Sequence, residues 1–551
     1  MRMFKEHKVR RCEALDGLWD FEKENGKSYL MPVPGCWEEH PEMLRYRGKG
    51  SYKKRITLSQ KENVRLIFKG VSHTADVYFD NKKVTHHYNA YTPFEVVIPG
   101  ASAGEHEIRV DVDNTFGEAS ALHKGNDYYT YGGITRPAGY EILSDVYIKN
   151  IHFTPYFKNN NWYATVEAEI ENITSKAQKC DVKFEIAGKV GVFENIEISG
   201  TEKLVWEEKF EEITPWSCEN PELYNINCQL FRDGECIDDL IDRCGFRTVE
   251  VKGKDILLNG EKVFLKGFNR HEDYADCGCA IPLQLMMKDI WLMKDMGCNA
   301  LRTSHYPNDE RFLDICDEMG IMVWEENHAR GLRLNDMLNP NFEKQCEDCI
   351  REMIYYHYNH PSIIIWGILN ECASETPEGR EMYKKQYEQI KTLDKSRPHT
   401  SASCKFFSDL CLDLPDIVSF NIYSGWYNDN PAKEYFEKHL DWVYSAGGEN
   451  KPFIMSEFGG AAMYGFRDPA RRKWSEEGQA DILEETLDVY MNNENVSGVF
   501  IWQFCDCRIT EEENWYQSRA CMRNNKGVVD RYRRPKLSYE VVKRKFTPNK
   551  K

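Results

Sequence analysis

Hydrophobic and polar residues alternate in several short runs within the first 250 residues of the chain. The clearest of these runs are residues 64–68, 75–79, 108–112 and 165–170. A period of two is typical of β-strands with one buried face. The pair Asp233-Gly234 lies between two apolar runs and favours a hairpin turn. The pattern predicts two all-β domains, a sandwich or jelly roll at 1–150 and a second sandwich at 151–250.

The pattern changes after residue 250, where short apolar runs alternate with segments of helical periodicity. The helical segments are 283–296, 343–357 and 381–393. The apolar runs are 263–268, 299–303, 321–324, 363–369, 400–403, 417–420, 453–455 and 498–501. Strands and helices that alternate over about 300 residues predict a (β/α)8 barrel, a TIM barrel, at 251–551.

Charge and composition narrow the range of partners and compartments. The chain has 551 residues, with 72 basic against 89 acidic side chains and a net charge of −17. This balance argues against a nucleic acid or an anionic membrane as the main partner. No apolar stretch is long enough for a membrane span, and no apolar segment typical of a secretory signal follows the basic N-terminus. The 19 cysteines are an odd number in a long chain, whereas disulfide scaffolds are short and cysteine-dense. We therefore expect a cytoplasmic protein.

Two carboxylates follow predicted strands of the barrel. The fourth strand leads into Asn370 and Glu371, and the seventh leads into Ser456 and Glu457. Active sites of such barrels lie where the strands end, so the two carboxylates are expected to face each other. Retaining glycosidases use such a pair, one group as the nucleophile and the other as the acid/base. Taken singly, each glutamate is equally compatible with an ordinary loop carboxylate.

Other strand ends carry polar and aromatic residues that suit a sugar. His305 follows the second strand, Tyr423 and Tyr427 follow the sixth, and Trp502 follows the eighth. Each signal is weak alone, but together they predict one cavity lined with donors, acceptors and aromatic rings. The chain has no phosphate-binding glycine loop, no serine elbow and no zinc-type cysteine spacing. We expect neither a metal nor an organic cofactor.

Ordered motifs along nearly the whole chain carry a family resemblance. They are residues 15–19, 34–37, 220–224, 245–247, 258–260, 267–273, 302–307, 366–371 and 456–459. With these motifs the chain resembles glycoside hydrolase family 2, and most of all its β-glucuronidase branch. The resemblance implies a sugar-binding jelly roll, an immunoglobulin-like sandwich and a catalytic barrel. It also implies that Glu371 is the acid/base, that Glu457 is the nucleophile, and that Asn370 holds the sugar 2-hydroxyl. The aromatic residues named above match pocket residues of the family.

The same resemblance points to an acidic sugar. Asn524 and Lys526 match the family's Asn-x-Lys motif, which grips the substrate carboxylate. An amide and an ammonium group are suitable donors for a carboxylate. Asp127 matches an aspartate that reaches the same pocket from the jelly roll, and Arg519 is the nearest match to an upstream arginine, with its spacing off by one. The implied activity is that of an exo-acting, retaining β-D-hexuronidase acting on a uronic acid glycoside.

One residue departs from the branch. Arg330 stands where glucuronidases usually have an aliphatic valine. An arginine in a sugar pocket adds a charge and several donors near the carboxylate or the 4-hydroxyl. Glucuronate and galacturonate differ only in the configuration at that hydroxyl. We hypothesise that Arg330 adapts the site to β-D-galacturonides. The alternative is an Arg330 that points into solvent, and Arg333 is a second candidate nearby.

Other functions stay open at this point. A β-glucuronidase is the second choice and a β-galactosidase the third, although the Asn-x-Lys motif opposes the third. A sugar-binding protein with an inert barrel is the remote alternative, which the intact pair of glutamates opposes. Because members of the family often assemble through their β domains and barrels, the resemblance also implies a homo-oligomer, a dimer or a tetramer.

Overall fold

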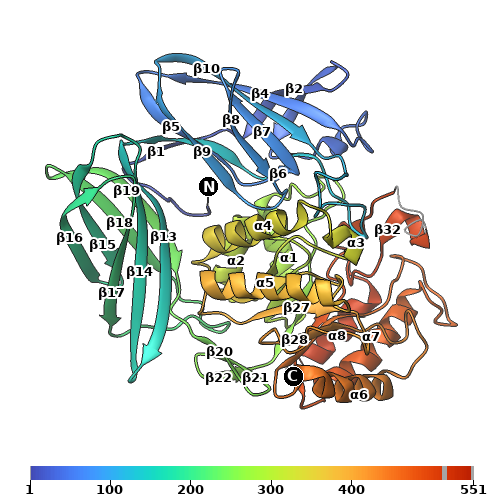
Figure 1. The fold of residues 1–551 in the computed structure, drawn as a ribbon. Coiled ribbons are helices and arrows are strands. Elements are labelled where there is room, and N and C mark those ends of the chain that lie inside the picture. The colour runs from blue at the N-terminus through green and yellow to red at the C-terminus, as the bar shows by residue number, and fades with distance from the viewer. Residues whose placement is uncertain (1, 512–517, 548–551) are drawn as a thin grey trace.

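The computed structural model describes residues 2–511 and 518–547, and Figure 1 shows them as three packed regions. The first region is a jelly roll of two antiparallel sheets and a short β11(Gly133–Ile134)-β6(Val71–Ser72) pair. One sheet has the order β1(Arg11–Ala14)-β12(Ala138–Leu143)-β5(Glu62–Phe68)-β9(Phe94–Ala101). The other has the order β3(Ser28–Val33)-β2(Gly17–Lys23)-β4(Lys49–Leu58)-β10(Gly104–Asp113)-β7(Thr74–Phe79)-β8(Lys82–Tyr88). Alternate residues of these strands meet in one apolar core.

The second region is an immunoglobulin-like sandwich, drawn in green in Figure 1. One sheet has the order β13(Val146–Lys158)-β14(Asn161–Asn172)-β17(Thr201–Phe210). The facing sheet has the order β16(Lys189–Ile198)-β15(Gln178–Ile186)-β18(Tyr224–Arg232)-β19(Glu235–Cys244). Side chains of β14 alternate strictly between partly exposed and buried positions, as the period of two predicts. The predicted hairpin turn is confirmed, because Asp233 and Gly234 link β18 to β19 with φ values of 52° and 81°.

The third region is a closed barrel of parallel strands, which confirms the predicted TIM barrel. A small sheet, β20(Val249–Lys252)-β21(Asp255–Leu258)-β22(Glu261–Val263), precedes it. The barrel strands are β23(Leu265–Asn269), β24(Ala300–Thr303), β25(Met322–Glu326), β26(Ile363–Ile368), β27(His399–Ser403), β28(Val418–Asn421), β29(Phe453–Phe458) and β30(Val496–Ile501). Every predicted apolar run overlaps one of these strands. The third and seventh strands extend further than predicted, so that Glu326 and Glu457 are themselves strand residues.

Helices surround the barrel and pack on the outside of its strands (Figure 1). They are α1(Leu283–Asp295), α2(Glu310–Met319), α3(Leu334–Met337), α4(Phe342–His357), α5(Pro377–Leu393), α6(Ala432–Val443), α7(Glu476–Met491) and α8(Leu537–Phe546). Helix α5 begins four residues before the predicted start, because Thr376 caps it by accepting a hydrogen bond from the Gly379 amide at 3.0 Å. None of the described helices is both long and apolar enough to cross a membrane.

The jelly roll packs directly on the mouth of the barrel. Arg136 donates a buried hydrogen bond to Glu272 at 2.8 Å, and the rings of Tyr91 and Tyr306 stack at 3.9 Å. The segment between β10 and β11 carries Asp127, and the Asn126 amide in this segment donates to the Thr510 hydroxyl at 3.1 Å. These contacts bring a jelly-roll residue to the edge of the barrel cavity.

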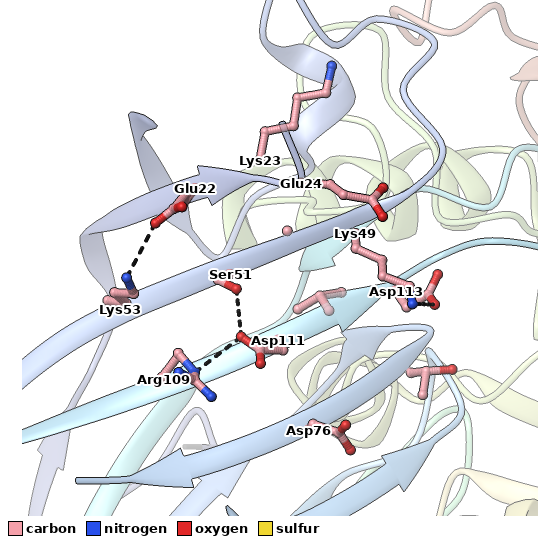
Figure 2. Close-up of a pocket in the computed structure, with 13 residues that line it drawn as sticks. Glu22, Lys23, Glu24, Lys49, Ser51, Lys53, Asp76, Arg109, Asp111 and Asp113 are labelled. Carbon is pink, nitrogen blue, oxygen red and sulfur yellow. Dashed lines mark hydrogen bonds and ion pairs between the residues drawn. The ribbon is translucent and has the colours of Figure 1, made fainter. Parts of the chain in front are cut away.

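A separate cavity of about 560 Å³ lies on the solvent-facing side of the larger jelly-roll sheet (Figure 2). Two of its lysines lie near carboxylates of opposite sign. Lys53 lies 3.4 Å from Glu22, and Lys49 lies 3.7 Å from Asp113. The lining mixes charges of both signs and contains no predicted site residue, so this cavity is not a candidate catalytic site.

Candidate active site

A cavity of about 320 Å³ opens at the carboxyl ends of the barrel strands. It is lined by Asp127, Arg330, Glu371, Cys404, Phe406, Asn421, Tyr423, Tyr427, Asn428, Glu457, Trp502, Arg519 and Lys526. Most of the predicted site residues are therefore brought together in one place. His305, Asn370 and Asn524 are outside this lining, and each is buried next to a residue that belongs to it.

The two candidate catalytic carboxylates come from the fourth and the seventh strands of the barrel. Glu457 lies within β29, whereas Glu371 follows β26 and has a left-handed backbone conformation with φ of 54°. Such a conformation is uncommon for a residue other than glycine, and residues held in it cluster at active sites and in turns. In this case it turns the chain just after Asn370, so that the glutamate side chain reaches the cavity.

Arg302 holds Glu457, the candidate nucleophile, in place. Its Nη1 donates to Oε1 of Glu457 at 2.9 Å, while its Nε and Nη2 bind both carboxylate oxygens of Glu326 at 2.8 and 2.9 Å. The guanidinium group is fully buried. A planar fork with several donors is well suited to fix two carboxylates at once. The motif at 302–307 contained this arginine, but nothing in its spacing showed that it would contact the seventh strand.

The environment of Glu457 makes its ionisation sensitive to its neighbours. Burial, together with repulsion from Glu371, raises the pKa of Glu457 to about 7. Arg302 opposes this rise, and so does Tyr423, whose hydroxyl donates to Oε2 of Glu457 at 2.8 Å. Glu457 therefore keeps its proton until the pH approaches neutrality.

Glu371 has two polar neighbours in the cavity. The side-chain amide of Asn421 donates to its Oε1 at 2.9 Å, and Nη2 of Arg330 lies 3.5 Å from its Oε2. Arg330 also donates to Oδ1 of Asn126 at 3.1 Å. Arg330 thus faces the cavity rather than solvent, whereas Arg333 is exposed and outside the lining.

Asn370 and His305 are buried next to residues that line the cavity. Oδ1 of Asn370 accepts from Nη2 of Arg302 at 2.8 Å, and its Nδ2 has no partner among the described residues. A buried amide donor without a partner is suited to a hydroxyl of a bound sugar. The His305 ring stacks on Trp502 at 5.1 Å. Burial and nearby cationic groups lower the pKa of His305 well below its usual range, so its imidazole is neutral.

Basic residues gather at the other end of the cavity. Nζ of Lys526 donates to the Tyr427 hydroxyl at 3.0 Å, and Nη2 of Arg519 donates to the same hydroxyl at 2.9 Å. Arg519 also binds Oδ2 of Asp127 at 2.6 Å. Burial raises the pKa of Tyr427, but the two cations outweigh burial and lower it overall. This cluster, which we call the cationic end, can receive an anionic group of a ligand.

Asn524 lies beside the cavity and outside its lining. Its side chain is fully buried, and its Nδ2 donates to the Asp127 carbonyl at 3.4 Å. Its Oδ1 has no partner among the described residues. The residue supports the segment that carries Asp127, and its direct grip on a carboxylate stays a prediction.

Two groups of described residues away from the cavity place metal-type ligand atoms within 4.8 Å of one another. They are His7, Cys12 and Glu141, and Asp314, Asp317 and His360. Buried arginines already bind one carboxylate in each group, since Arg10 contacts Glu141 at 2.9 Å and Arg2 contacts Asp314 at 2.6 Å. An arginine at this distance competes with a cation for the carboxylate oxygens.

Comparison with known families agrees with this arrangement. Residues 18–140 match the sugar binding domain of glycosyl hydrolases family 2, residues 146–247 match a further domain of that family, and residues 249–550 match its TIM barrel domain. The chain belongs to glycosyl hydrolases family 2 and is therefore a glycoside hydrolase.

Individual relatives include enzymes that act on acidic and on neutral sugars. The chain is similar to the crystal structure of a GH2 β-galacturonidase from Eisenbergiella tayi bound to galacturonate, with 49% identity, a TM-score of 0.96 and coverage of 99% of both chains. A β-glucuronidase from Streptococcus agalactiae is 28% identical over 98% of this chain and 96% of its own length. A β-galactosidase from Thermoanaerobacterium thermosulfurigenes is 30% identical over 98% of this chain and 74% of its own length.

Proposed function

We propose that the protein is an exo-acting, retaining β-D-hexuronidase that prefers β-D-galacturonides. The observation that carries the proposal is the placement of Glu371 and Glu457 in one small cavity with the cationic end of Lys526 and Arg519. A cavity of about 320 Å³ suits a single terminal sugar better than an internal segment of a polymer.

The proposed reaction proceeds in two displacements. Glu457 attacks the anomeric carbon as Glu371 protonates the oxygen of the leaving group, and a covalent glycosyl-enzyme forms. Water then attacks the same carbon after giving its proton to Glu371, and the bond to Glu457 breaks. The free amide donor of Asn370 is placed to hold a hydroxyl of the sugar during both steps.

The substrate carboxylate binds at the cationic end in this proposal. Lys526 supplies an ammonium donor, and the Tyr427 hydroxyl links it to Arg519. Charge-assisted hydrogen bonds of this kind are stronger than neutral ones, so a neutral hexoside lacks a large share of the binding free energy. The names of the relatives at 49% and 28% identity, which are a galacturonidase and a glucuronidase, support this substrate class.

Arg330 is the residue proposed to select galacturonides. It lines the cavity and stands between Glu371 and Asn126, where its donors face the bound sugar. A site built to pair a hydroxyl discriminates strongly, because the wrong epimer leaves buried polar groups without partners. The similarity to a structure named as a galacturonidase supports the same choice.

The deciding experiment compares kcat/KM on p-nitrophenyl β-D-galacturonide, β-D-glucuronide and β-D-galactoside. The proposal expects the galacturonide to be the best substrate, by roughly tenfold or more over the glucuronide. A glucuronide preference would make the protein a β-glucuronidase, and activity on the galactoside alone would support the β-galactosidase to which it is 30% identical. No hydrolysis of any of the three would point to an inert sugar-binding protein.

Retention has its own test. Proton NMR during hydrolysis identifies the anomer that is released first, before mutarotation mixes the two forms. The double displacement predicts that the β-hexuronic acid appears first, whereas release of the α-anomer would show inversion. Dialysis against a chelator is expected to leave kcat unchanged, because the two glutamates supply acid, base and nucleophile without a cofactor.

The assembly and the compartment are also proposed. We expect a homo-oligomer, a dimer or a tetramer, which light scattering coupled to gel filtration can determine. We also propose that the protein works in the cytoplasm, with the free state of all 19 cysteines as support. Fractionation of the source cells tests this, and recovery from the culture medium would contradict it.

A further inference from the structure

Two cysteines from different domains meet at the interface between the jelly roll and the barrel. Cys36 follows β3 in the jelly roll, and Cys279 lies in the barrel segment between β23 and α1. Their sulfur atoms are 3.5 Å apart although the residues are separated by 243 positions in the chain. The sulfur of Cys36 also lies 3.6 Å from the carbonyl oxygen of Cys277. Neither cysteine lines the catalytic cavity.

Both segments are held firmly in this arrangement. On the jelly-roll side, the amide of Trp37 donates to the Gly132 carbonyl at 3.0 Å. On the barrel side, Gly278 closes a turn through its amide, which donates to the Tyr274 carbonyl at 3.0 Å. Gly278 has φ of +54°, and a Cβ at this position would lie 3.0 Å from the Cys36 sulfur. The close approach of the two segments therefore requires a glycine here.

The two thiols differ in their access to solvent. Cys36 is 3% exposed and packs with Tyr129 and Tyr131, whereas Cys279 is partly exposed at the edge of this cluster. Burial and the hydrogen bond with Cys279 raise the pKa of the Cys36 thiol well above its usual range. An oxidant from solvent is therefore expected to react first at Cys279.

We propose that Cys36 and Cys279 form a reversible disulfide that ties the jelly roll to the barrel under oxidising conditions. Disulfide sulfurs are about 2.0 Å apart, so the two atoms must approach each other by about 1.5 Å. A rotation of the partly exposed Cys279 side chain, with a small shift of its loop, supplies this movement. A transient bond of this kind is compatible with a reducing compartment that experiences oxidative stress.

The oxidant is a peroxide in the simplest case, and the reaction balances. The Cys279 thiolate attacks one oxygen of hydrogen peroxide, which breaks the O–O bond and gives a sulfenic acid and, after proton transfer, water. The Cys36 sulfur then attacks that sulfur as its thiol proton passes to the departing hydroxide, which leaves as a second water. Two thiols and one peroxide thus give one disulfide and two waters. A small-molecule disulfide such as oxidised glutathione gives the same product through a mixed disulfide, with release of two thiols.

The bond would act on the part of the jelly roll that supports the catalytic cavity. Tyr131, which packs against Cys36, donates to Asp273 at 2.9 Å, and Asp127 lies four residues before it in the same segment. A cross-link over a long stretch of chain restricts the unfolded state more than the folded one. We therefore expect a higher midpoint of thermal unfolding, by about 2–5 °C, with kcat/KM on the preferred substrate within twofold of the reduced enzyme.

The test uses the full-length protein equilibrated in glutathione buffers of increasing oxidised fraction, or treated with hydrogen peroxide. Free thiols are then blocked with N-ethylmaleimide, and a non-reducing digest is analysed by mass spectrometry. The proposal expects one dominant cross-linked peptide pair, joining Cys36 to Cys279, which disappears on reduction. Cys279→Ser should abolish both the cross-link and the rise in unfolding midpoint.

Cys277→Ser is the matched control, because it changes a neighbouring thiol in the same turn and should leave both effects intact. The unfolding midpoint of each reduced variant verifies that it is folded. The proposal is overturned if Cys36 stays unlinked at every potential, if it pairs with Cys277 instead, or if the oxidised wild-type protein unfolds at the same temperature as the Cys279→Ser variant.

Discussion

Nη2 of Arg330 lies 3.5 Å from Oε2 of Glu371, so a fixed positive charge adjoins the candidate acid/base. Main-chain hydrogen bonds also hold the segments of these two residues next to each other. The amide of Gly331 donates to the Asn370 carbonyl at 2.8 Å, and the amide of Asn370 donates to the Ala329 carbonyl at 3.0 Å. The segment that carries Arg330 is therefore tied to the segment that carries Glu371, and substitution of the arginine should leave the backbone in place.

Replacement of Arg330 should change the choice between epimers. We expect Arg330→Val to lower the ratio of kcat/KM for galacturonide over glucuronide by roughly 10- to 100-fold, because buried donors that pair one epimer are lost. The ratio is measured with the two p-nitrophenyl glycosides. Arg333→Val is the matched control, since Arg333 belongs to the same segment but is exposed. An unchanged ratio in Arg330→Val would remove Arg330 from the specificity argument.

The pH profile should report the ionisation of Glu457. The proposed reaction needs this carboxylate ionised as the nucleophile. Since the pKa of Glu457 is raised to about 7, kcat/KM should rise as the pH increases through about 7. A plateau of kcat/KM from pH 6 to 9 would contradict this assignment.

Tyr423→Phe tests whether the ionisation of Glu457 sets the pH profile. The Tyr423 hydroxyl donates to Glu457 at 2.8 Å and so favours the ionised carboxylate. Its loss should raise the pKa of Glu457 further and move the rising limb of the profile upward by about one to two pH units, since a hydrogen bond to a charged group contributes about 1.5–3 kcal/mol. A lower kcat with an unmoved limb would indicate that Tyr423 acts only on the substrate.

The fold could be predicted because the period of the hydrophobic residues distinguishes strands from helices. Period-two runs became strands of the β domains, and apolar runs between helices became barrel strands. The barrel also explains why strand-end residues as far apart in the chain as Glu371 and Glu457 line one cavity, since all parallel strands end on the same face. The places of these two residues at predicted strand ends were therefore enough to predict that they share a cavity.

Contacts that depend on side-chain reach were not predictable in the same way. Arg302 binds Glu457 and Glu326, but its position at a strand end did not show which residues its side chain would contact. Arg519 reaches Asp127 despite its shifted spacing, because a long side chain compensates for one residue of offset. Conversely, Asn524 fits its motif but bonds to the main chain of Asp127 outside the cavity lining.

Loss of the ammonium group at the cationic end should separate acidic from neutral substrates. We expect Lys526→Gln to lower kcat/KM on the hexuronide by about 100-fold or more, which corresponds to roughly 3 kcal/mol for a buried charged partner. The activity on the galactoside, if measurable, should change by less than about threefold. Arg523→Gln is the control, because this nearby basic residue is exposed. Equal losses on both substrates would show that Lys526 supports the structure of the cavity rather than the carboxylate.

A stack of buried histidines should make the enzyme sensitive to acid. His123 stacks on His73 and makes a tilted contact with His328, with ring centroids 4.5 and 4.3 Å away. The stack joins the jelly roll to the barrel beside the cavity. Burial lowers the pKa of His73 to about 3 and that of His328 to about 4, and burial together with the neighbouring imidazoles lowers the pKa of His123 well below its usual range.

The direction of the effect follows from proton binding. Below the usual histidine pKa of about 6.5, the unfolded chain binds protons at these histidines, whereas the folded chain keeps them neutral. The stability that their neutral packing contributes is therefore present above pH 6.5 and is lost as the pH falls toward 4. Each histidine lowers the free energy of unfolding by about 1.4 kcal/mol per pH unit in this window.

His123→Phe keeps a ring in the stack but cannot titrate, so its unfolding midpoint should fall less steeply between pH 6.5 and 4 than that of the wild type. His86→Phe changes an exposed histidine and should follow the wild-type slope. Parallel slopes for His123→Phe and the wild type would show that carboxylates elsewhere, rather than this stack, set the acid limit.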